Sequence, residues 1–444
     1  MNATVKTQTR GETAKDLAMV DFRELITQGC FTHDMVELNS VGRENFTLSG
    51  YPERKDERFT YVDLLEVKNA RLHLRKEPSY TNREEVERLL FPSATNSRIV
   101  FVDGVFIPYL SDMTSVRFQI ELLPLGVAME RYPQVKKELL DSAFAEQDPF
   151  ANLNAAFAMN GAYLKINDGE QLKSPVEIIY FSAEYKTPTL LSAPRLFVDI
   201  GEKAKAAIIF KNMKEQGPYL FNAVSTMAVR AQAQASVYHL ALNHSSAARF
   251  SKLGVIQYAH SSVKMVTVNA GAKTSRWSFD WKLREPGASM ELKSLAPLHG
   301  KSQNHIYSRV THEAPDCSSQ LLFKNIVDGE ARSSVDSTVI VDPGARGSAS
   351  HQLINNLLLS DGARADNKPN LMIHNDDVQC SHGVTIGQLD EETLFYFMSR
   401  GMGKAEASRS LINGFAREVT DAILEPYALA VVEENVLLHK RGIV

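Results

Sequence analysis

The spacing of apolar residues changes twice along the chain and divides it into three regions. In the first, residues 1–160, apolar positions three and four apart are typical of helices and occur in VERLLFPS and VKKELLDSAFAEQ. Two short strands joined at Asp103-Gly104 are predicted within RIVFVDGVFIPYL, because Asp-Gly is a strong hairpin signal. A further helix in FANLNAAFAMNGAYL should break at Asn160-Gly161. We therefore expect residues 1–160 to form a mixed helical region with a hairpin.

In the second region, residues 161–385, helical spacing gives way to more than ten short runs rich in β-branched and aromatic residues. Small residues separate many of them, with Gly287-Ala288, Gly344-Ala345 and Gly362-Ala363 at such corners. Glycine permits the positive φ that a tight corner requires, and a neighbouring alanine lets stacked turns approach closely. A sandwich, a barrel and a stacked β-helix all fit, and periodicity alone does not separate them.

In the third region, residues 386–444, helical spacing returns. The run LDEETLFYFMSRG predicts a helix with Asp390 as its N-cap and Gly401 at its end. A second helix is predicted in KAEASRSLINGFAREVTDAIL, and its apolar stripe consists of Ala407, Leu411, Phe415 and Val419, continued by Ile423. This helix hairpin must bury its stripe against the β region or against another protein.

Composition removes several classes of function. The net charge of -4 gives no reason to expect nucleic acid as a partner. No apolar stretch is long enough for a membrane span, and the N-terminus lacks the apolar core of a secretory signal. The three cysteines, Cys30, Cys317 and Cys380, are far apart, so no disulfide framework is indicated and the cytoplasm is the expected location.

The strongest chemical candidate is Cys380 with His382. Residues two apart on an extended segment face the same side, so a thiolate and an imidazole could both reach one iron or zinc ion. Two ligands do not complete a site, and the others would have to come from elsewhere in the chain or from a partner. The alternative is a buried cysteine and a hydrogen-bonded histidine at a domain junction, and the pattern alone favours this alternative.

Two other motifs are weaker candidates. Three histidines, His299, His305 and His312, lie close in sequence but are expected on different strands or turns rather than in a metal site. The run Gly300-Lys301-Ser302 resembles the end of a P-loop, but Leu295 stands where the motif needs a glycine. The chain itself is therefore not expected to bind ATP.

Residues 357–402, LLLSDGARADNKPNLMIHNDDVQCSHGVTIGQLDEETLFYFMSRGM, closely resemble the SufB/SufD family of iron–sulfur cluster assembly proteins. The family pattern includes SD-x-A, Pro-x-Leu, DDV-x-C-x-H-G-A-T, G-x-L-D-x-E-x-LFY and SRG, and here Val384 replaces the usual alanine. Weaker matches, with Phe59 in place of a tryptophan, extend the resemblance to about residues 45–425. No resemblance is identified for the N-terminal 40 residues or for the tail NVLLHKRGIV. The chain is more similar to SufD than to SufB. SufB-type chains typically carry C-E-H-E-A in place of the C-S-H-G-V found here, and an N-terminal cysteine cluster, which this chain lacks.

The resemblance implies a mainly β fold, with a right-handed parallel β-helix core over residues 161–385 between N-terminal and C-terminal helical regions. It also implies a non-enzymatic scaffold subunit that pairs with SufB, docks the ABC-type ATPase SufC and supports cluster assembly. His382, and with it Cys380, would supply iron ligands or line an iron path at the SufB–SufD interface. No cofactor would then bind stably to the chain alone, and iron or a nascent cluster would bind only in the complex. The SufC-binding domain would be residues 386–444, with partner-binding residues Leu389, Asp390, Phe395, Tyr396, Arg400 and Gly401.

Two other functions stay open at this point. The chain could fill the SufB role and accept sulfur directly, or it could be a carbohydrate-active enzyme built on a β-helix, such as a polysaccharide lyase. A β-helix has exposed edges that invite self-pairing, so a homodimer is also expected when partners are absent.

Overall fold

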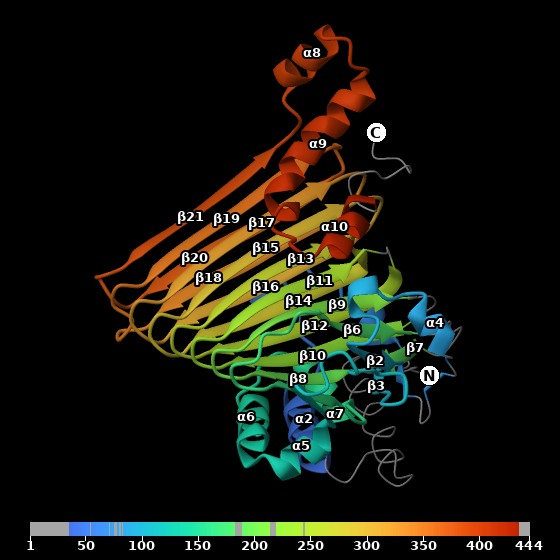
Figure 1. Cartoon of the computed structure of the whole chain (residues 1–444). Coiled ribbons are helices and arrows are strands. Elements are labelled where there is room, and N and C mark those ends of the chain that lie inside the picture. The colour runs from blue at the N-terminus through green and yellow to red at the C-terminus, as the bar shows by residue number, and fades with distance from the viewer. Residues whose placement is uncertain are drawn as a thin grey trace, which may run out of the picture.

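The centre of the molecule is a pair of stacked parallel sheets (Figure 1). The computed structural model describes residues 35–434, apart from 54, 71, 75–77, 80, 82, 183–188, 214–218 and 243–244. From β8 onward, consecutive strands alternate between the two sheets, and each strand pairs in parallel with the strand two positions further along the chain. This pairing defines a β-solenoid, and it excludes the sandwich and the barrel. The expected mainly β fold with a β-helix core and helices at both ends is confirmed.

Among the described residues the two sheets have 11 and 10 strands. The first sheet contains β1 (Leu72–His73), β4 (Ile120–Pro124), β5 (Ala162–Ile166), β7 (Thr189–Ser192), β8 (Arg195–Ile200), β10 (Tyr219–Val229), β12 (Ser245–Gln257), β14 (Ala272–Leu283), β16 (Gln303–His312), β18 (Arg332–Val341) and β20 (Arg364–Ile373). The second sheet contains β2 (Arg98–Val102), β3 (Val105–Phe106), β6 (Val176–Phe181), β9 (Lys205–Met213), β11 (Gln234–Ala241), β13 (Ser262–Asn269), β15 (Ser289–Leu298), β17 (Ser318–Val327), β19 (Ala349–Leu358) and β21 (Gln379–Gly387).

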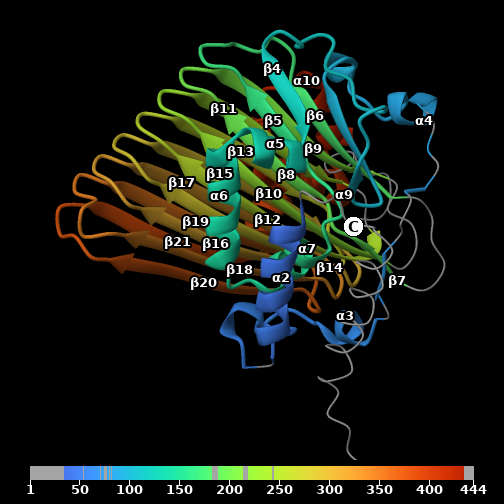
Figure 2. The ribbon, with the colours of Figure 1, turned by 90° about the horizontal axis from the view of Figure 1, so that it is seen from below.

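Helices lie at both ends of this core and along its outer faces. The helices of the described chain are α2 (Val36–Ser49), α3 (Leu65–Asn69), α4 (Arg83–Glu87), α5 (Leu125–Arg131), α6 (Pro133–Phe144), α7 (Pro149–Phe157), α8 (Glu391–Ser399), α9 (Lys404–Thr420) and α10 (Pro426–Val432), with short 3-10 turns at Glu57–Phe59 and Pro92–Ala94. Seen from below, α2, α5, α6 and α7 lie against the outer face of the first sheet (Figure 2). The outer face of the second sheet is covered by α9 and α10 (Figure 1). None of the helices described here is long and apolar enough to cross a membrane.

Several local predictions are confirmed. Asp103 and Gly104, with φ of 52° and 89°, form the turn between the antiparallel strands β2 and β3. Helix α7 ends at Phe157, shortly before Asn160-Gly161. The helix predicted in VERLLFPS is wrong beyond Glu87, where α4 ends. Pro92 restricts the residue before it to an extended conformation, which prevents the helix from continuing.

The three predicted Gly-Ala corners show why small residues are needed where the chain turns between strands. Of the three predicted Gly-Ala corners only Gly287 has a positive φ, of 70°, whereas the alanines at all three are buried. A Cβ atom on Gly362 would lie 2.7 Å from the carbonyl oxygen of Gly329 in the preceding coil. Close stacking of coils, rather than turn conformation, therefore explains most of these small residues.

The apolar stripe predicted on the second C-terminal helix is only partly right. Ala407 and Val419 are buried as expected, and so is Ile423, which lies beyond the helix end. Leu411 and Phe415 are only half-buried. Ile412 and Ala416 lie in the contact with the second sheet instead. Four residues turn a helix by more than one full revolution, so a stripe of strict four-residue spacing drifts around the axis.

Candidate metal-binding edge and docking helix

Cys380 and His382 lie on β21, the last strand of the second sheet. Cys380 is half-buried and packs against the apolar cluster between the two sheets. Because side chains alternate along a strand, His382 lies on the same face, but at a position where β21 is exposed to solvent. The two potential ligands therefore share the inner face of the last coil, at the open end of the solenoid.

The neighbouring strand carries polar residues directly opposite this pair. In the parallel register Ser350 is paired with Cys380, and Gln352 is paired with His382. Burial raises the pKa of the Cys380 thiol, although a hydrogen bond from the Ser350 backbone opposes this effect. A thiol with a raised pKa stays protonated until a metal or base displaces the proton.

A row of buried hydrogen bonds leads inward from Ser350. Its hydroxyl accepts from Ser319 at 2.8 Å, and Ser319 is in turn 2.8 Å from Nε2 of His312. Burial lowers the pKa of His312 to about 4, so the imidazole is neutral in the core. This polar row was missed in the sequence, because only the stacking of coils brings together residues 31 apart.

No group of three or more His, Cys, Asp and Glu side chains is placed to hold a metal ion anywhere in the described chain. Asp376 and Asp377 precede the pair in an exposed turn, and the Asp377 amide donates to Oδ1 of Asn375 at 2.9 Å. Contrary to expectation, His305 and His312 share the single strand β16. They are an odd number of positions apart and so face opposite sides, and each is 2.7–2.8 Å from a serine hydroxyl. They do not form a metal site.

The two last strands form a bare edge. β20 is the terminal strand of the first sheet and β21 of the second, and most of their side chains are exposed. The exposed positions include large apolar residues, namely Met372, Ile373, Val384 and Ile386, the last with 54% of its side chain accessible. A long exposed edge with apolar side chains is unusual for a free protein surface.

Helix α8 projects beyond the last coil, away from the sheets (Figure 1). None of its residues is buried, and Phe395 and Tyr396 are 73% and 53% exposed. Asp390 caps the helix by accepting a hydrogen bond from the Thr393 amide at 3.0 Å, as predicted. Gly401, with φ of 93°, follows the end of the helix. The sequence thus forms a capped helix whose aromatic residues Phe395 and Tyr396 stay exposed to solvent.

The two remaining predicted docking residues, Leu389 and Arg400, make contacts within the chain. Leu389 is partly buried against the cluster that joins α9 and α10 to the second sheet. The Arg400 guanidinium lies 5.1 Å from the centre of the Tyr396 ring. Cys30 and the unmatched tail, residues 435–444, lie outside the described residues.

Two family models match the chain. Residues 182–415 match the SufBD core domain of the SUF system for iron–sulfur cluster assembly, and residues 20–178 match the SufBD N-terminal region. An iron–sulfur cluster assembly SufBD family protein of Synechocystis is 30% identical over 390 residues, which cover 84% of each chain. The chloroplastic protein ABCI7 of Arabidopsis thaliana is 28% identical over 90% of this chain and 84% of its own. The iron–sulfur cluster assembly protein SufD of Escherichia coli is 26% identical over 84% of this chain and 86% of its own. This chain belongs to the SufBD family of the SUF iron–sulfur cluster assembly system.

Proposed function

We propose that the chain is a SufD-like, non-enzymatic scaffold subunit that pairs with a SufB-like protein through the bare edge formed by β20 and β21. The observation that carries this proposal is the exposed apolar character of both terminal strands. The backbone donors and acceptors along their outer sides have no neighbouring strand within the described chain. A second solenoid end of matching length can add strands to both sheets at once, which buries the apolar residues and satisfies the backbone.

This pairing would complete an iron site around His382 and Cys380. Imidazole and thiolate ligands suit iron, but two of them leave the coordination shell open. At the shared edge, a partner's side chains would supply the missing ligands. Iron and the growing cluster are then substrate and product of the complex, and the chain alone holds neither stably.

The exposed helix α8 supports a second contact, with a SufC-like ABC-type ATPase. Large aromatic residues at a protruding, rigid position are typical interface anchors. Phe395 and Tyr396 would enter the ATPase surface, while Asp390 and Leu389 fix the direction of the helix. Because α8 is joined directly to β21 by residues 388–390, movement of the ATPase would be transmitted to the strand that carries His382.

Affinity purification of the tagged full-length chain from its own cells tests this proposal. We expect an ABC-type ATPase and a second β-helix protein to co-elute. Ile386→Lys should remove the β-helix protein and keep the ATPase, whereas Phe395→Ala should do the reverse. Recovery of the chain without either protein would overturn the proposed assembly role. The purified chain alone should form a homodimer through the same edge, and Ile386→Lys should make it monomeric.

A further inference from the structure

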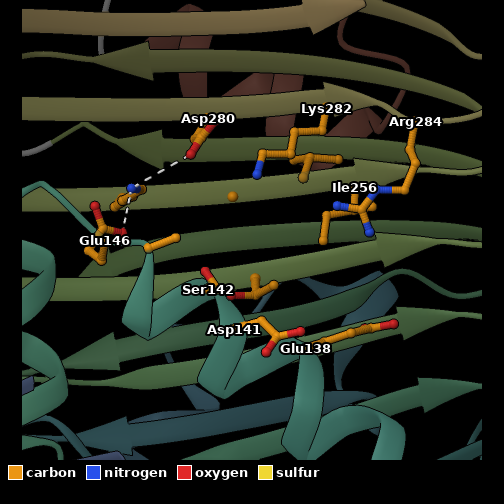
Figure 3. A pocket seen from close by; sticks show the side chains of 13 residues that line it. Glu138, Asp141, Ser142, Glu146, Ile256, Asp280, Lys282 and Arg284 are labelled. Carbon is orange, nitrogen blue, oxygen red and sulfur yellow. Dashed lines mark hydrogen bonds and ion pairs between the residues drawn. The ribbon is translucent and has the colours of Figure 1, made fainter. Parts of the chain in front are cut away.

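A polar cleft lies on the outer face of the first sheet, far in sequence from β20, β21 and α8. It is bounded by α6, by the segment that joins α6 to α7, and by strands β12, β14 and β16. The cleft consists of two adjoining hollows with volumes of about 200 and 260 Å³. The smaller one is shown in Figure 3, where Glu138 and Asp141 face Lys282 and Arg284 across it.

An ion-paired lysine stands between the two hollows. Lys252 lies 2.6 Å from Glu146 and 3.8 Å from Asp280, and these contacts are drawn as dashed lines in Figure 3. It therefore balances the charge of Glu146, an acid that borders both hollows. Next to it on the strand, Gly254 presents no side chain, so the floor of the smaller hollow stays open.

The larger hollow contains a buried arginine that is only partly paired. The Arg276 side chain is 3% exposed, and its Nη1 atom donates to Asp148 at 2.6 Å. Its Nη2 atom is buried and has no hydrogen-bond partner. A buried guanidinium N–H group without a partner is energetically unfavourable, and it indicates a missing acceptor at this position.

Two further cations, Lys282 and Arg309, line the same hollow without an ion-pair partner in the described chain. No side-chain hydrogen bond or ion pair joins Lys282 or Arg309 to another described residue, although both line the larger hollow. They lie on adjacent strands, and Arg309 is opposite Asp280, two residues from Lys282. Among the acids that line this hollow, Asp148 is paired with Arg276 and Glu146 with Lys252, so Asp280 alone is left to balance the two cations Lys282 and Arg309. The larger hollow therefore has a surplus of positive charge.

We propose that this hollow is an anion-binding site for a phosphate group, held by Arg276, Lys282 and Arg309. Three separate donors suit a tetrahedral oxyanion with three terminal oxygens better than a carboxylate with two. The hydroxyl of Tyr307, which also lines the hollow, supplies a fourth donor. The volume admits a phosphate with a small organic group, but it is below the usual range for nucleotide-sized ligands.

The charge distribution also selects one hollow over the other. Asp141 lines only the smaller hollow and forms no ion pair with a described basic residue, whereas Asp148 and Glu146 in the larger hollow are both ion-paired. A phosphate is therefore favoured in the larger hollow over the smaller one. The site is independent of the proposed scaffold role, because none of its residues lies on β20, β21 or α8.

Titration calorimetry of the full-length chain with inorganic phosphate, and separately with glycerol 1-phosphate, tests the proposal. Ionic strength is kept constant with chloride. We expect saturable binding of phosphate at millimolar or lower concentration, and Lys282→Ala and Arg309→Ala should each weaken it about tenfold. Binding of both ligands would identify a phosphomonoester site, and binding of phosphate alone would identify a site for the free ion.

The matched control is Lys264→Ala, which removes an exposed lysine from β13 on the other sheet. This variant should bind phosphate like the wild type, and all three variants should unfold at the same temperature. Absence of saturable phosphate binding to the wild type would overturn the proposal. Equal weakening by Lys264→Ala and Lys282→Ala would do so as well, because it would show only a general attraction to surface charge.

Discussion

The two ends of the solenoid are built in opposite ways. At the N-terminal end the sheets finish in β3, of two residues, and β4, of five, and both run antiparallel to their neighbours. At the C-terminal end they finish in β20 and β21, of ten and nine residues, in parallel register with exposed apolar side chains. Short, reversed and covered edges prevent further pairing, whereas long bare ones invite it. The chain closes one end with its own residues and leaves the other open, as the proposed pairing requires.

The N-terminal helices are held on the solenoid by aromatic packing of α7. The Phe150 ring stacks on Phe250 of β12 with centroids 3.7 Å apart, and Phe59 lies 5.8 Å from Phe150. Asp148, the residue before α7, caps this helix by accepting a hydrogen bond from the Phe150 amide, and it also forms an ion pair with Arg276 of β14. One short segment therefore joins the N-terminal helices to the middle of the first sheet.

Removing one phenylalanine from the N-terminal helices and one from the C-terminal helices tests this difference most directly. Phe150→Ala should lower the free energy of unfolding by about 3–5 kcal/mol, because it opens a cavity at a buried ring. Phe395→Ala should change it by less than about 0.5 kcal/mol, because that ring is in solvent. Urea unfolding followed by circular dichroism measures both. Equal losses would mean that α8 is part of the folded core rather than a docking element.

The stabilisation that Asp148 provides at the start of α7 depends on pH. Burial alone would raise the pKa of Asp148, but the charges of Arg276 and Lys252 lower it to about 2. A carboxyl group with a lowered pKa stabilises the fold above its unfolded pKa of about 3.9, and the stabilisation is lost as pH falls through 2. We expect a contribution of about 2 kcal/mol that disappears between roughly pH 4 and pH 2.

Unfolding measurements across that pH range on the wild type and Asp148→Asn test this effect. The difference in unfolding free energy between them should be largest near neutral pH and shrink below pH 4. A difference that stays constant down to pH 2 would contradict the assigned pKa.

The sequence was sufficient where structure depends on neighbouring residues. The Asp103-Gly104 hairpin and the Asp390 cap each need only a few consecutive residues, and both were predicted correctly. The choice between sandwich and solenoid needed strand order, which alternating apolar residues do not encode. Family resemblance, rather than periodicity, resolved it.

The sequence did not predict the contacts that form between stacked coils. Arg276 and Asp148 are 128 positions apart, and Ser319 and Ser350 are 31 apart, so no local pattern links them. The Cys380–His382 pair was found because its two residues lie on one strand. The sequence does not show that Cys380 faces the core or that β21 is an edge, and these two facts decide what the pair can do.

The open end should respond to mutation without loss of stability. Ile386→Lys places a charge on an exposed edge strand, so the free energy of unfolding of the chain alone should change by less than about 0.5 kcal/mol. Pairing with a second β-helix protein should be lost, because the charge would be buried at the shared edge without a partner. Co-purification and unfolding of the same variant separate the two effects. Retained pairing would move the interface away from β21.

The smallest structural change is expected for His382→Ala, which tests chemistry at the open end rather than its shape. His382 is exposed, so its removal should leave both stability and partner binding unchanged. Iron–sulfur cluster formation on the purified complex, followed by visible absorbance, should fall, because one proposed iron ligand is missing. His374→Ala is the matched control, since it removes an exposed histidine that directly follows β20. If both variants assemble clusters at the wild-type rate, His382 has no part in iron handling, and the bare edge serves only to join the two subunits.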